Sequence, residues 1–163
     1  MNDPVWFLRV YDGVRHSFPT RWLEWLMAVY ITWWGVSFIG VSPDPNPAIA
    51  AKSAWHDLTF WAPIPIWSLL MILIGVARLL ALAINGTFRD TIYSQYSPVV
   101  RGACAFLSGV VWAFVALSSL SAGTQSAITY PTVFLIEWFM AWFVFGEAGD
   151  NLRAHYGRRK PKR

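Results

Sequence analysis

Charged residues are scarce in this sequence. They make up 13% of its 163 residues, against roughly 25% in soluble domains. Hydrophobic residues reach 56%, and 11 residues are tryptophan. So few charges cannot cover a surface that faces water, but they suit a chain surrounded mostly by lipid. The composition therefore excludes an ordinary soluble domain and predicts a membrane protein.

Cysteine and histidine are equally sparse. A single cysteine, Cys104, excludes an intrachain disulfide and a dithiol redox site. His16, His56 and His155 lie outside the long hydrophobic segments, which excludes a bis-histidine haem site there. The sequence shows no metal-ligand spacing, no glycine-rich phosphate loop and no nucleophile elbow. We therefore predict a protein without enzymatic activity, cofactor or metal.

Four hydrophobic segments approach the length of about 20 residues that a helix needs to cross a bilayer. They cover residues 22–41, 65–84, 98–120 and 131–147. Ser97 before Pro98 predicts a capped start for the third segment, and Asn85 with Gly86 predicts the end of the second. We expect an all-α fold, in which residues 1–163 form one membrane domain built as an antiparallel bundle of four transmembrane helices.

The two ends of the chain have their own patterns. Residues 3–18 place apolar side chains on one helical face and are followed by Pro19, which predicts a short amphipathic helix at the membrane interface or a poorly ordered leader. Residues 148–163 form a basic tail, which predicts contact with anionic lipid headgroups rather than with nucleic acid. Its cations are Arg153, Arg158, Arg159, Lys160, Lys162 and Arg163.

The basic residues predict the orientation of the chain. Eleven of the 13 lie before the first segment, between the second and third, or after the fourth, when Arg101 near the start of the third segment is counted with the loop before it. On the opposite side there is only Lys52, and Arg78 lies inside a segment. Loops rich in Lys and Arg stay in the cytoplasm. We therefore expect a multi-pass protein of a bacterial inner membrane with both termini in the cytoplasm.

Ionisable residues inside the segments are costly in lipid, so each one calls for a partner. Counting residues from the segment ends places Arg78 near the depth of Glu24. We predict an ion pair between these two, with Glu147 as a competitor; alternatively, Arg78 reaches the lipid phosphates. The same count gives Glu137 no cation at its level. It is then either part of a proton or polar pathway, or a neutral, hydrogen-bonded packing residue.

Small residues predict where the helices approach one another. Gly35 and Gly75 lie on small or polar stripes of the first and second segments. The third segment carries a longer track, formed by Gly102, Ala105, Gly109, Ala113 and Ala116. If this small-residue track faces inward, the protein is a closed monomeric bundle. If it faces outward, the track offers a seam for a homo-oligomer or for another membrane protein.

Four short stretches resemble small, uncharacterised membrane proteins of tailed phages and prophages. They are residues 8–12, 21–25, 78–90 and 96–101. The resemblance implies a holin-like protein that permeabilises the membrane or regulates that event. A second hypothesis is a membrane interaction protein, such as a superinfection-exclusion factor. A third is a small transporter, because four helices and a glutamate on the first resemble small multidrug transporters.

Overall fold

A computed structural model describes residues 4–39, 54–87, 92–123 and 128–158, and within these ranges it contains helices and no strand. The predicted all-α class is confirmed for this part of the chain. The helices are α1 (Pro4–Ser37), α3 (Ala54–Trp61), α4 (Ile64–Thr87), α5 (Ile92–Ser121) and α6 (Thr129–Arg158).

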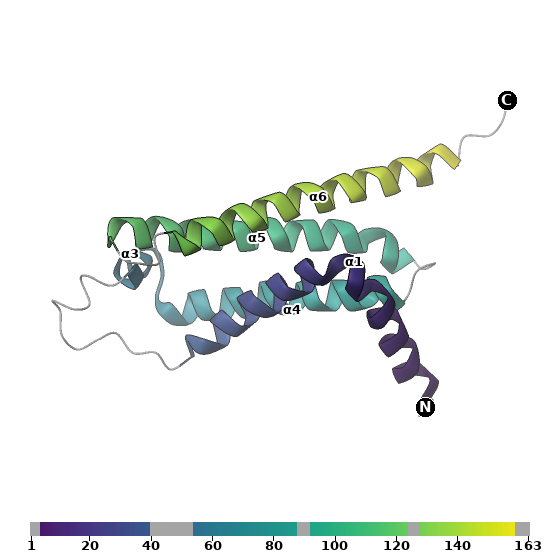
Figure 1. Ribbon diagram of the computed structural model, residues 1–163, viewed down its shortest axis with the longest axis horizontal. Helices are drawn as coiled ribbons and strands as arrows, with labels where there is room; N and C mark the ends of the chain where they lie inside the picture. The colour runs from purple at the N-terminus through teal and green to yellow at the C-terminus, as the bar shows by residue number, and fades with distance from the viewer. Residues whose placement is uncertain (1–3, 40–53, 88–91, 124–127, 159–163) are drawn as a thin grey trace.

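The four long helices lie side by side and alternate in direction along the chain (Figure 1). α1 packs on α4, α4 on α5, and α5 on α6, while the short α3 packs on α5. We call the end where α4 stops and α5 starts the tail end, because α6 also stops there (Figure 1). The opposite end is the loop end. α4 and α6 both run from the loop end to the tail end.

Among the residues that the structure describes, three helices are long and apolar enough to cross a membrane. The stretches are Ile64–Asn85, Tyr96–Ser121 and Thr129–Asp150. They contain the second, third and fourth predicted segments (65–84, 98–120 and 131–147) completely. The first predicted segment, 22–41, falls partly in α1 and partly outside the described residues.

Several helix ends differ from those predicted. α5 begins at Ile92 and contains Pro98, so Ser97 does not cap it. Instead the Ser97 hydroxyl donates a 2.8 Å hydrogen bond to the Ala81 carbonyl of α4. This contact and the burial around it offset the hydrogen bond that a proline removes from a helix. α4 likewise continues through Gly86 to Thr87, and α6 continues beyond residue 147 to Arg158.

The helix end predicted at Pro19 lies within two residues of a break in α1, which consists of two helical parts joined at a kink. The backbone departs from helical geometry two residues later, at Arg21, with φ −132° and ψ 21°. Figure 1 shows the first part of α1 bending away from the bundle at the tail end. A proline inside a helix favours such a kink. The kink places Arg21 where α1 meets the tail end of α6.

Aromatic rings fill the interior towards the loop end. Trp112 of α5 stacks on Tyr30 and on Tyr130, with ring centroids 5.3 Å and 5.9 Å apart. Trp34 meets the Trp112 ring edge-on at 5.8 Å. We call these four residues the aromatic layer. They join α1, α5 and α6 by side-chain packing, and Trp112 is fully buried.

Glycines permit the close approach of α1 and α4. A Cβ atom on Gly35 would lie 2.8 Å from the Ser68 carbonyl oxygen, and one on Gly75 would lie 2.9 Å from the Ala28 carbonyl oxygen. The Ser68 hydroxyl donates a 2.6 Å hydrogen bond to the Gly35 carbonyl. In lipid, such close packing and interhelical hydrogen bonds replace the hydrophobic drive of soluble proteins.

Candidate functional site

Arg78 and Glu137 form an ion pair in the middle of the bundle, which we call the central pair. The Arg78 Nη1 atom lies 2.7 Å from Glu137 Oε2, and both side chains are fully buried. The Ser108 hydroxyl donates a 2.7 Å hydrogen bond to the other carboxylate oxygen, Oε1. Three helices, α4, α5 and α6, therefore contribute to this pair.

Arg78 has more donors than partners. Its Nε and Nη2 atoms are buried and have no hydrogen-bond partner among the described residues. An unpaired buried donor costs about 1–3 kcal/mol, and more when it is charged. These two N–H groups are therefore the least satisfied polar atoms of the central pair.

The predicted pairing of Arg78 with Glu24 is wrong. Arg78 pairs with Glu137, which was predicted to have no cation at its level, and Glu24 pairs with Arg101. The prediction compared backbone depths and ignored side-chain direction. A long side chain on a helix points back towards the helix N-terminus. On α4 that direction leads away from the tail end, where Glu24 lies, and towards Glu137.

A second group of charges, which we call the tail-end network, joins α1, α5 and α6. Arg101 is fully buried and binds Glu24 through two contacts, 2.9 Å from Nε to Oε2 and 3.1 Å from Nη2 to Oε1. Its Nη2 atom also donates to Glu147 Oε2 at 2.9 Å. Arg21 Nη2 donates to the other Glu147 oxygen at 2.7 Å. With its amide oriented so that the oxygen faces both cations, Asn85 accepts from Arg101 Nη1 at 3.0 Å.

Sequence reasoning missed Arg21 and Arg101 as site residues, because both were assigned to cytoplasmic segments. The expected capped start at Pro98 placed Arg101 at the edge of its helix, whereas it is the tenth residue of α5. One signal was available. Arg101, Cys104 and Ser108 are spaced as residues that share one helical face, which is the buried face of α5.

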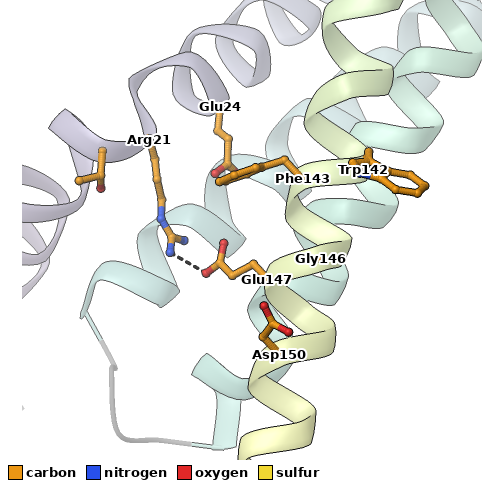
Figure 2. A pocket seen from close by; sticks show the side chains of 8 residues that line it. Arg21, Glu24, Trp142, Phe143, Gly146, Glu147 and Asp150 are labelled. Atoms are coloured by element: carbon orange, nitrogen blue, oxygen red, sulfur yellow. Dashed lines mark hydrogen bonds and ion pairs between the residues drawn. The ribbon is translucent and has the colours of Figure 1, made fainter.

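A cavity of about 590 Å³ opens beside the tail-end network, between α1 and α6. It is lined by Thr20, Arg21, Glu24, Trp142, Phe143, Gly146, Glu147 and Asp150. Figure 2 shows the Arg21 and Glu147 side chains pointing towards each other across it. Glu24 is only 3% exposed, so it forms the inner wall of the cavity.

The small-residue track of α5 lies largely inside the protein. A Cβ atom on Gly102 would lie 2.9 Å from the Phe145 ring, and one on Gly109 would lie 3.6 Å from the Glu137 Cβ atom, both on α6. Ala105 and Ala116 are buried, while Ala113 is half-buried. The track is therefore mostly occupied by contacts within the chain.

The remaining predicted residues are not part of either group. Arg158 is the last residue of α6, while Arg159, Lys160, Lys162 and Arg163 lie outside the described residues. No cluster of His, Cys, Asp and Glu suited to a metal ion occurs within the described ranges. In comparisons with protein-family models, curated proteins and solved structures, nothing matched this chain.

Proposed function

We propose that this chain is a four-span protein of a bacterial inner membrane that acts without enzymatic chemistry, by binding another membrane component. In this proposal the part of α1 after Arg21 belongs to the first span, and both termini are cytoplasmic. Support comes from three apolar helices of sufficient length, from the packing of α1 on α4, and from the distribution of basic residues.

One observation favours a binding role over pore formation. The arginines of the two charged groups find their carboxylate partners within a single chain. Three arginines (Arg21, Arg78 and Arg101) face three glutamates (Glu24, Glu137 and Glu147). A pore made of several copies needs polar surface or close-packing seams directed at neighbouring copies. Here the charges and most of the small-residue track are used inside the protein.

The outer surface is apolar and aromatic, as a lipid-facing or partner-facing surface would be. Exposed side chains on α6 include Leu135, Phe139, Trp142 and Phe143. A superinfection-exclusion factor or a partner of a host membrane protein is consistent with such a bundle. The holin-like hypothesis stays a prediction, which the following experiment also tests.

The test is induced expression in bacteria, with membrane potential, lysis and infection by a panel of tailed phages followed together. We expect unchanged potential, no lysis and reduced plating of at least one phage. The Arg78→Met variant, produced at the same level, is the control and should lose the effect because it loses the central pair. A collapse of the potential would support the holin-like hypothesis instead. Normal plating of every phage would count against superinfection exclusion.

The orientation is tested separately with reporter domains. A reporter fused after Arg163 should report the cytoplasm, and one inserted in the loop at residues 43–47 should report the periplasm. A periplasmic C-terminus would overturn the proposed topology.

A further inference from the structure

A buried polar stripe follows α5 from the tail end to the middle of the bundle. It consists of Ser97, Arg101, Cys104 and Ser108, whose exposures are 4%, 0%, 7% and 0%. The spacing of four, three and four residues keeps all of them on one helical face. The stripe passes from the tail-end network, through Arg101, to the central pair, through Ser108.

The far end of this stripe contains the two unpaired donors of Arg78. Each requires an acceptor, and Glu137 already neutralises the guanidinium. An added anion would leave a net negative charge in the interior, which is costly in a membrane protein. A water molecule supplies an acceptor oxygen without adding charge. Water is therefore the ligand that the chemistry of Arg78 favours.

The near end of the stripe adjoins a source of water. Glu24 lines the tail-end cavity and also binds Arg101, the second residue of the stripe. The cavity, at about 590 Å³, holds many water molecules, since each occupies roughly 30 Å³ in the liquid. From Arg101 to Ser108 the helix rises about 10 Å. A few water molecules in line would span that distance.

The stripe ends at the aromatic layer. Trp112 follows Ser108 by one turn and stacks between Tyr30 and Tyr130. Around it lie apolar side chains that are almost completely buried, including Ile31, Met71 and Val115. The Trp112 Nε1–H group is buried here without a hydrogen-bond partner among the described residues, while Ile31, Met71 and Val115 supply no polar group that would continue a chain of water molecules.

We propose that water enters the bundle from the tail-end cavity, runs along the polar stripe and hydrates the Nε and Nη2 groups of Arg78. The path stops at the aromatic layer, so the central pair communicates with one side of the membrane only. These water molecules connect the Glu137 carboxylate with the water at the tail end, while the loop end stays sealed.

Cys104 is a native reporter of this path, since it lies on the stripe between Arg101 and Ser108. The experiment measures its modification by the permanently charged reagent 2-(trimethylammonio)ethyl methanethiosulfonate, applied to spheroplasts and to inverted membrane vesicles. The control is the double variant Cys104→Ser/Val115→Cys. Val115 is also buried on this face of α5, eleven residues further on and beyond Trp112. Mass spectrometry gives the modified fraction over time.

We expect Cys104 to react at least about tenfold faster from the tail side than from the loop side, and the cysteine at position 115 to react slowly from both. Equally slow reaction of Cys104 from both sides would overturn the proposal. Fast reaction at position 115 would do so too, because it would mean a path through the aromatic layer. Hydroxyl-radical labelling of the unmodified protein gives a second measure that needs no variant. Relative to the unfolded chain, Cys104 should be oxidised faster than the buried Met71.

Discussion

Replacing Arg78 by methionine keeps much of the side-chain volume and removes the cation of the central pair. Glu137 is then left charged and buried, with only the Ser108 hydroxyl as a partner. Breaking one side of a fully buried ion pair costs about 3–5 kcal/mol. Replacing both residues, as Arg78→Met/Glu137→Gln, removes the charge altogether, and the glutamine oxygen still accepts from Ser108. We expect the double variant to lose only about 1–2 kcal/mol.

The difference is measurable as a double-mutant cycle. Purified variants are unfolded in mixed detergent micelles by increasing the fraction of dodecyl sulfate, and unfolding is followed by tryptophan fluorescence. A coupling energy of about 2 kcal/mol or more, roughly a thirtyfold effect on the equilibrium, is expected between Arg78 and Glu137. Arg21→Met with Glu137→Gln is the control cycle and should be additive, because Arg21 pairs with Glu147. Additive losses at positions 78 and 137 would refute the central pair.

Three further predictions concern packing and the tail-end network. Gly75→Ala should lower the melting temperature in detergent, because its Cβ atom would meet the Ala28 carbonyl and the Thr32 side chain. Gly146→Ala is the control and should not lower it, since nothing lies within 4 Å of the added Cβ atom. Equal effects of the two substitutions would contradict the close approach of α1 and α4. Arg101→Met should cost about 3–5 kcal/mol, because it leaves the buried Glu24 without a cation. Arg21→Met should cost only about 0–1 kcal/mol, because the side chains of this ion pair are partly exposed, at 22% and 28%. A larger loss would show that this partly exposed contact holds α1 in place.

The helices could be predicted from the sequence because long apolar segments have few alternatives in a membrane protein. The inward-facing stripes of small or polar residues could be predicted for the same reason. Ala105 and Ala116 were assigned to the small-residue track by spacing alone, and both are buried. Periodicity reports which residues share a face, and in a bundle the small or polar face turns away from lipid.

The partners of the charges could not be obtained in this way. The pairing of charges depends on helix ends, side-chain direction and the order of helices around the bundle. None of these can be deduced from the periodicity of residue types in the sequence. An error of six residues at the start of α5 removed Arg101 from the interior and left Glu24 free to be matched with Arg78. The short helix α3 was not predicted either, because its eight residues follow a proline-rich segment and resemble an aromatic loop.

The sequence separation within the ion pairs has a consequence for biosynthesis. Arg78 pairs with a carboxylate 59 residues further along the chain, on the last helix. At about 5–20 residues per second, a ribosome needs roughly 3–12 s to synthesise that interval. During this delay α4 carries an unneutralised guanidinium, while Arg101 arrives after its partner Glu24 has already been made. We therefore expect α4 to be inserted stably only after α6 has been synthesised. Nascent chains that stop before residue 137 should remain bound to the insertion machinery or be degraded.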